Sequence, residues 1–106
     1  MPIIRFVESW NGKLNKKVFT TIRRCDEKKR YYYQKQLGKV FQVKLKGQEY
    51  CQAKLVGIWY DKFENVPKDI LTEDTGLSLE KAITLFSRFK CVGNNVIILT
   101  FQRSET

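Results

Sequence analysis

The chain has 106 residues, of which 42% are hydrophobic and 29% charged, a composition typical of one globular domain. Twenty Lys and Arg residues against eleven Asp and Glu give a formal net charge of +9, and the chain has no histidine. The sequence therefore excludes histidine metal ligands and every nucleophile system that needs a histidine base.

The first predicted elements occupy the N-terminal quarter of the chain. Ile3–Val7 is a short apolar run that predicts a strand, and residues 8–15 predict a short helix, which Gly12 weakens. Val18–Arg24 is rich in β-branched and aromatic residues and predicts a second strand.

Alternation along this second strand divides its side chains between two faces. Val18, Thr20 and Ile22 share one face, which we expect to join the core because it is apolar. Thr21 and Arg23 share the other face, where a hydroxyl and a guanidinium would lie side by side.

The positive charge is concentrated between residues 13 and 46. This segment contains twelve of the Lys and Arg residues and only two acidic ones, Asp26 and Glu27, whereas the rest of the chain is almost neutral. An uneven distribution of this kind indicates a surface that binds polyanions. A membrane surface is a weaker interpretation, because the segment has neither an amphipathic helical period nor a lipidation signal.

Within this basic segment, three cations run directly into three aromatic residues, in the order Lys28-Lys29-Arg30-Tyr31-Tyr32-Tyr33. Cations neutralise phosphates, and aromatic rings stack on unpaired bases with about 1–3 kcal/mol per base. The alternative is a solvated basic loop whose tyrosines alternate in and out of the core. We expect at least one of the three tyrosines to be structural.

A predicted hairpin follows. Residues 39–46 alternate between apolar and polar, and the apolar members are expected to point inward: Phe41, Val43 and Leu45. Gly47-Gln48 predicts the turn, and Tyr50–Tyr60 predicts a long strand in which Gly57 marks a bulge or a bend.

The C-terminal third predicts helices and a last strand. A helical turn is expected near Val66–Leu71, and Ser78 is a suitable N-cap for a helix over Leu79–Phe89. The apolar positions at helical spacing, expected to be buried, are Leu79, Ala82, Ile83, Phe86 and Phe89. Val96–Phe101 predicts a central closing strand. The elements together predict a single α+β domain over residues 1–106, mainly β, built as a small mixed barrel of five to six strands with one to three helices.

Cysteine and hydropathy patterns set further expectations. Cys25, Cys51 and Cys91 are widely spaced and form no CxxC motif, so they predict neither a disulfide framework nor a zinc site. We expect reduced thiols in a cytoplasmic protein. No run approaches the roughly 18 apolar residues of a membrane span, and no signal peptide is recognisable. We expect no metal, no other cofactor and, by default, a monomer.

Five stretches of the chain carry a resemblance to a known family. Lys16–Arg24 is similar to a glycine-lysine-lysine-threonine-x-threonine-isoleucine-arginine strand, and Tyr33–Val40 to the approach to the next strand. Ala53–Leu55 pairs a small residue with an aliphatic one, Asp74–Ser78 leads into a helix, and Val96–Phe101 resembles a closing strand. In order and spacing these motifs resemble the ASCH family, within the PUA-like superfamily of RNA-associated β-barrels.

The resemblance implies a five- or six-stranded barrel with a cleft beside the threonine-arginine strand. It also implies RNA binding, or action on RNA and nucleosides. Some family members hydrolyse an acetylated cytidine with a lysine, a threonine and a glutamate, and one branch is described as a ribonuclease. The family's arginine corresponds to Arg23 in this chain.

The three amidohydrolase positions correspond only in part. The threonine corresponds to Thr21, but the lysine position holds Val18, next to Lys17, and the glutamate position holds Thr75, next to Asp74. The catalytic candidates are therefore Lys17, Thr21 and Asp74. Because a misplacement near 1 Å costs roughly 100-fold in rate, these departures weaken the enzymatic interpretation.

The favoured function is a non-catalytic module that binds single-stranded or modified RNA through a basic cleft. The expected contact residues are Lys16, Lys17, Thr21, Arg23, Arg24, Lys28, Lys29, Arg30 and Tyr32. The first alternative is an amidohydrolase acting on an acetylated cytidine nucleoside. The second is a ribonuclease that uses the carboxylates of residues 61–80, although these show no recognisable ligand spacing. The partner is thus RNA or a nucleoside.

Overall fold

The computed structural model describes residues 1–104. In this range the chain forms five strands, three α-helices and two 3-10 segments. In chain order they are β1 (Ile3–Phe6), η1 (Trp10–Asn15), β2 (Val18–Arg24), α1 (Glu27–Gln36), β3 (Val40–Leu45), β4 (Gln48–Lys62), η2 (Phe63–Asn65), α2 (Lys68–Thr75), α3 (Leu79–Arg88) and β5 (Asn95–Arg103). The predicted α+β class, mainly β with five to six strands and one to three helices, is confirmed, and the expected barrel is a curled half-barrel of five strands.

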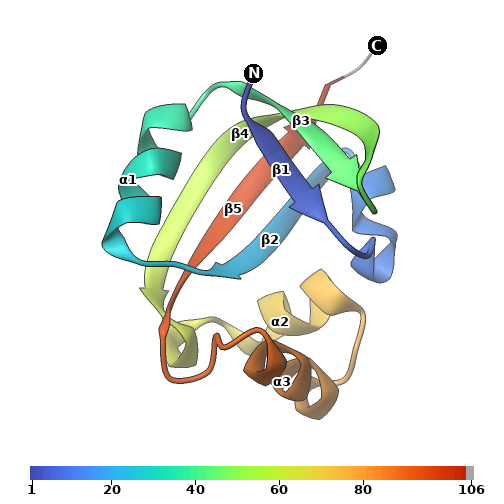
Figure 1. Ribbon diagram of the computed structural model, residues 1–106. Helices are drawn as coiled ribbons and strands as arrows, with labels where there is room; N and C mark the ends of the chain where they lie inside the picture. Colours follow the sequence, from blue (N-terminus) through green and yellow to red (C-terminus); the bar gives the residue numbers. More distant parts are fainter. Residues whose placement is uncertain (105–106) are drawn as a thin grey trace.

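All five strands belong to one sheet, in the order β1-β3-β4-β5-β2. The β1–β3 pair is parallel and the other three pairs are antiparallel. The sheet curls into a half-barrel, so its two edge strands, β1 and β2, face each other across an opening (Figure 1). This opening is where the site described below lies.

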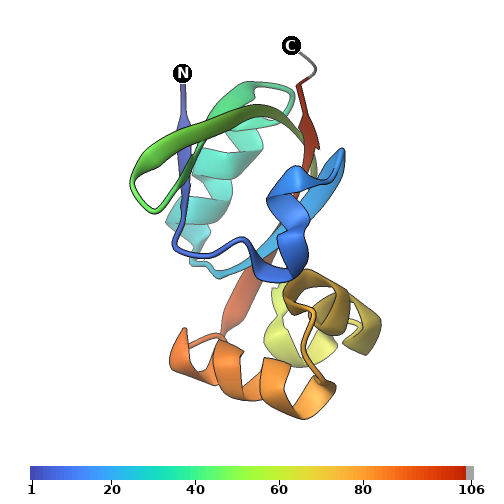
Figure 2. The same cartoon turned by 90° about the vertical axis from the view of Figure 1, so that its right-hand side faces the viewer.

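Two hydrophobic clusters pack against the sheet. The larger one fills the inside of the curl around Phe41, Leu99 and Phe101. The second joins β2 and β5 to the helices and contains Ile98 and Phe86. Figure 2 shows α2 and α3 as a separate layer at one end of the sheet, with η1 between this layer and the strands.

The alternation predicted for β2 is present, but the two faces are exchanged. Phe19 is 3% exposed and packs inside the curl, whereas Val18 is 51% exposed on the outer face. On that outer face only Ile22 is buried, where it meets the helical layer. The expected core face was therefore wrong, and the face that carries Thr21 and Arg23 points into the barrel.

The three cations and three tyrosines of residues 28–33 lie in a helix, α1. They do not form the solvated loop that the sequence left open as an alternative. Asp26 caps the helix by accepting a hydrogen bond from the Lys29 amide at 2.9 Å. No residue of α1 is classed as buried, which explains why its sequence lacks an amphipathic period. Tyr33, which is partly buried, packs against the core and is the structural tyrosine that was expected.

Most of the other predicted elements are found within one or two residues of their expected positions. The hairpin turn lies at Lys46 and Gly47, one residue earlier than predicted, and the register of β4 shifts between Leu55 and Gly57. At the bulge, a Cβ on Gly57 would lie 3.3 Å from the Thr100 Cβ, so glycine allows the two strands to approach closely.

Helix α3 begins at the predicted cap, where the Ser78 hydroxyl accepts a hydrogen bond from the Lys81 amide. Its buried face is narrower than predicted. Ala82 and Phe86 are buried, but Ile83 is 40% exposed and Phe89 46% exposed. None of the helices in residues 1–104 has the length and apolarity that a membrane crossing requires.

Candidate functional site

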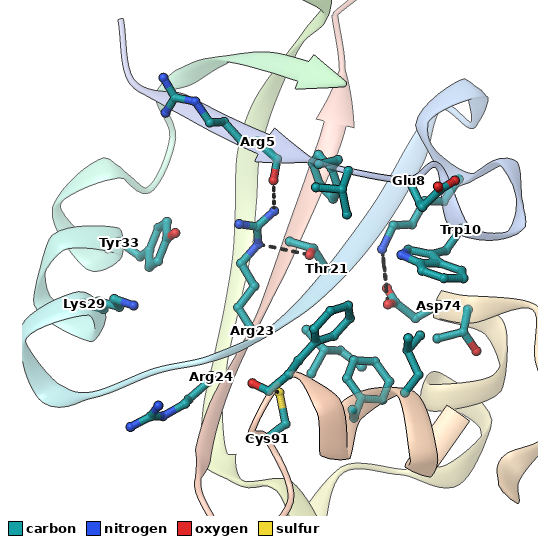
Figure 3. A pocket seen from close by; sticks show the side chains of 18 of the residues that line it. Arg5, Glu8, Trp10, Thr21, Arg23, Arg24, Lys29, Tyr33, Asp74 and Cys91 are labelled. Atoms are coloured by element: carbon teal, nitrogen blue, oxygen red, sulfur yellow. Dashed lines mark hydrogen bonds and ion pairs between the residues drawn. The ribbon is translucent and has the colours of Figure 1, made fainter. Parts of the chain in front are cut away.

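A cavity of about 510 Å³ lies at the opening between β1 and β2. Its wall is built from both edge strands, the loop before η1, η1 itself, α1 and the helical layer (Figure 3). The charged side chains that line it are Arg5, Glu8, Lys13, Arg23, Arg24, Lys29 and Asp74. Cations thus outnumber carboxylates, and a cavity of this volume lies within the range of small-molecule sites.

Arg23 spans the opening between the two edge strands. Its Nη2 donates to the backbone carbonyl of Arg5 at 2.7 Å, and its Nε donates to the Thr21 hydroxyl at 3.2 Å (Figure 3). The guanidinium carbon also lies 4.9 Å from the centre of the Phe6 ring. These contacts hold the guanidinium in one place and use only two of its five N–H donors, so others are left for a ligand.

Burial lowers the pKa of Arg23, whereas the neighbouring Tyr33 phenol and the Asp74 carboxylate act to raise it. Burial likewise raises the pKa of Tyr33, and Arg23 opposes that rise. Arginine side chains stay charged in proteins, and the raised pKa of Tyr33 keeps its phenol protonated near neutral pH. The inner part of the cavity offers a cation beside a hydroxyl that can donate a hydrogen bond.

A buried ion pair forms a second wall. The Lys13 Nζ lies 3.2 Å from both carboxylate oxygens of Asp74, and Thr20 Oγ1 donates to the Oδ1 of Asp74 at 2.9 Å. Lys13 is 4% and Asp74 5% exposed. Burial lowers the pKa of Lys13 and raises the pKa of Asp74, and in each case the partner's charge acts in the opposite direction.

The position of Lys13 follows from the backbone of η1. Asn11 and Gly12 both have positive φ angles, of 55° and 61°, so the segment is kinked at these two residues. The Asn11 side-chain amide donates to the Glu73 carbonyl at 3.0 Å, which ties η1 to α2. The segment consequently directs the Lys13 side chain inward, onto Asp74.

Aromatic rings complete the cavity. Trp10 lies beside Asp74 on one side, and Tyr33 faces the cavity from α1 on the other (Figure 3). Tyr32, which is 45% exposed, packs edge-to-face on Tyr33 with ring centroids 5.3 Å apart. Phe89 contributes an exposed ring from the end of α3. Planar, apolar groups could therefore be contacted from several sides.

The structure brings together six of the residues selected from the sequence. Those that line the cavity are Thr21, Arg23, Arg24, Lys29, Tyr32 and Asp74. A threonine and a carboxylate therefore share this site. Thr21 is buried there, and Asp74 is paired with Lys13.

The other selected residues lie elsewhere. Lys16 and Lys28 are exposed and outside the lining of the cavity, and Lys17 lines a different hollow near the C-terminal end of β5. Arg30 is held by an ion pair with Glu27 at 3.7 Å and by the ring of Tyr60 at 4.7 Å. The three candidate catalytic residues are therefore not assembled in one place.

Sequence reasoning missed many residues that line the site, and Lys13, Trp10 and Arg5 are three that bear on its chemistry. Lys13 takes the position beside the carboxylate that was expected for Lys17, and Trp10 and Arg5 also line the cavity. No local pattern identifies Lys13, because its partner Asp74 is 61 residues away in the sequence. The pairing of Asn11 with Gly12 was the available signal, since both residues favour left-handed backbone.

Comparison of the chain with models of protein families, with curated proteins and with solved structures gives no match. The interpretation of this cavity thus rests on its own geometry and on the sequence resemblance.

Proposed function

We propose that this protein is an RNA-binding module of the PUA-like, ASCH-related type, which holds an unpaired nucleotide in the cavity between β1 and β2. The observation that carries the proposal is one cavity of about 510 Å³ that combines the fixed guanidinium of Arg23 with aromatic rings and further cations. Proteins that bind single-stranded nucleic acid combine cations for the phosphates with rings for the bases.

The phosphate and the base of the nucleotide each have suitable partners. Arg24 and Lys29 are exposed cations at the rim, formed by the end of β2 and the first turns of α1, where a phosphate would be contacted. The Arg23 guanidinium presents N–H donors to the acceptor atoms of a base. Tyr32 and Trp10 supply rings for stacking, worth about 1–3 kcal/mol per base.

Single-stranded RNA is favoured over duplex RNA. The deep major groove of an A-form helix is too narrow for side chains, whereas an unpaired base can be turned out of the strand and inserted. The Thr21 and Arg23 side chains point into the barrel, so only an extruded group could contact both.

The test uses Trp10 as a reporter. The chain has two tryptophans, and Trp59 lies outside the lining of the cavity, so the Trp59→Phe variant leaves Trp10 as the one fluorophore of its kind. We expect single-stranded RNA to change Trp10 fluorescence, with an affinity that falls steeply with salt, and a duplex of the same sequence to bind more weakly. The matched Trp10→Phe variant should bind with little fluorescence change. RNA binding with unchanged Trp10 fluorescence, or no RNA binding at low salt, would overturn the proposal.

A second candidate is an amidohydrolase acting on an acylated nucleoside, and one observation favours it: the Lys13–Asp74 pair and Thr21 line the same cavity. Such a reaction needs a hydroxyl to attack the amide carbonyl and neighbouring groups to carry protons. Deacylation of an acetylated cytidine that is lost in Thr21→Val and retained in Lys17→Ala would support this candidate. Absence of turnover in the wild-type protein would eliminate it.

A further inference from the structure

A second hollow of about 360 Å³ lies near the start of β2, at the opposite end of that strand from Arg24 and the cavity. Five residues line it: Lys17, Lys54, Gln102, Arg103 and Ser104. Each of these five side chains can donate a hydrogen bond, and within residues 1–104 the lining includes no carboxylate. The chemistry of the lining is therefore that of an anion site, and the hollow is too open to enclose a ligand fully.

Strand pairing sets the spacing of this group. In the sheet, Gln102 of β5 lies between Val18 of β2 and Lys54 of β4. Neighbouring strands are roughly 4.8 Å apart, so the lining spans about two strand spacings, a width suited to a phosphate group.

Arg103 is held in place before any ligand arrives. Its Nη1 donates to the Leu14 carbonyl at 2.9 Å, and its guanidinium carbon lies 5.6 Å from the centre of the Tyr50 ring. The Tyr50 hydroxyl in turn donates to the Asn15 side chain. A guanidinium with a fixed orientation loses little entropy on binding and suits the oxygens of a phosphate.

The distance from this hollow to the cavity defines the kind of ligand that could occupy both. From Lys17 to Arg23 the chain advances six positions, which in a strand is about 20 Å. That distance exceeds the length of a single nucleotide. β2 is an edge strand, so a ligand could follow it from one end to the other.

We propose that the Lys54–Arg103 hollow binds a backbone phosphate of the same RNA strand whose unpaired nucleotide enters the cavity, several nucleotides away. This inference rests on the proposed function and adds a length requirement to it: the protein would recognise a strand of several nucleotides, bound at both ends of β2.

The experiment compares Lys54→Gln with Lys62→Gln. Both lysines are exposed on β4 and both changes remove one charge, but Lys62 lies outside the lining of the hollow and of the cavity. The affinities for a mononucleotide and for single-stranded RNAs of increasing length are measured against salt by titration calorimetry. Trp10 fluorescence in the Trp59→Phe background separately reports whether the cavity is occupied.

We expect Lys54→Gln to leave mononucleotide binding unchanged. For the longer strands it should reduce the slope of log affinity against log salt by about 0.7, the contribution of one single-strand phosphate contact. Lys62→Gln should change neither the affinity for the mononucleotide nor the salt slope for the longer strands. Because Lys54 is exposed, the variant should fold, and a circular dichroism melt checks this.

Three results would overturn the inference. The first is an equal effect of the two lysine variants on long RNA, and the second is an equal loss of mononucleotide and long-strand binding in Lys54→Gln. The third is Lys54-dependent binding to phosphatidylserine vesicles without an effect on RNA, which would assign the hollow to a membrane surface. If long RNA binding depends on Lys54 but Trp10 does not respond, the phosphate site stands and the cavity proposal fails.

Discussion

The Lys13 ammonium lies 3.2 Å from both carboxylate oxygens of Asp74, and this buried pair joins η1 to α2. The contact links two segments that lie far apart in the sequence, at the place where the strands meet the helical layer (Figure 2). It therefore positions the Asp74 side of the cavity relative to the Thr21 side.

Removing one partner of this pair should be costly. In Lys13→Met, Asp74 remains buried and keeps the hydrogen bond from the Thr20 hydroxyl but loses its ion-pair partner, so we expect a loss of about 3–5 kcal/mol in the free energy of unfolding. The double variant Lys13→Met with Asp74→Leu should recover much of that loss, because no buried charge is left unpaired. Urea denaturation measures both. A double variant as unstable as the sum of the two single variants would contradict this account.

Two glycines offer a matched test of the contact between η1 and α2. Gly76 and Gly93 both have left-handed φ angles, of 71° and 79°, but a Cβ on Gly76 would lie 3.0 Å from the Asn11 side chain, whereas one on Gly93 would meet nothing within 4 Å. Gly93→Ala should cost about 1 kcal/mol through backbone strain alone. Gly76→Ala should cost more, because it also displaces Asn11. Equal losses in thermal or urea unfolding would show that the Asn11 contact is not tight.

The pKa of Cys25 predicts a pH dependence of stability. Burial, followed by the charge of Asp26, raises the pKa of this thiol from 9.0 to about 11 in the folded protein. The stability that it contributes is therefore fully present below about pH 9 and is lost as the pH rises towards 11, because the unfolded chain loses the proton first.

Urea unfolding of the wild type and of Cys25→Ala between these pH values measures this contribution. The other titrating groups are common to both proteins, so the difference between the two curves isolates Cys25. The wild type should lose more stability than the variant across the window. Parallel curves would show that the Cys25 thiol ionises at its ordinary pKa.

The basic residues of α1 should contribute unequally to RNA binding. Lys29 lines the cavity, whereas Arg30 is already engaged by Glu27 and the Tyr60 ring. Lys29→Ala should reduce the salt slope for single-stranded RNA by about 0.7. Arg30→Ala should change the slope less and should lower stability by about 0.5–1 kcal/mol, through loss of the cation–π contact. Filter binding at several salt concentrations measures the slope for each variant. A larger change for Arg30→Ala than for Lys29→Ala would place the contact surface elsewhere on α1.

Local pattern was enough to predict most of the elements. The alternation of residues 39–46 places Phe41 and Val43 in the core, and Ser78 caps α3 as expected. Both features depend on short-range chemistry, namely side-chain periodicity and hydrogen bonding within a few residues, so the sequence by itself determined them. Thr21 and Asp74, which line one cavity, were selected through the resemblance to a family and not through local pattern.

Tertiary structure alone decided which face of β2 is buried and where α1 lies. Periodicity shows that Val18, Thr20 and Ile22 share a face of β2, but not that the curl of the sheet puts Phe19 on the inside. Helix α1 buries no residue, so it leaves no hydrophobic period in the sequence to find.

The identity of the buried lysine was likewise set by the fold. Lys17 is near Thr21 in sequence, yet Lys13 is the lysine that contacts Asp74, because the left-handed backbone at Asn11 and Gly12 turns η1 towards α2. A contact between residues 61 positions apart depends on how the whole chain packs, which no local spacing encodes.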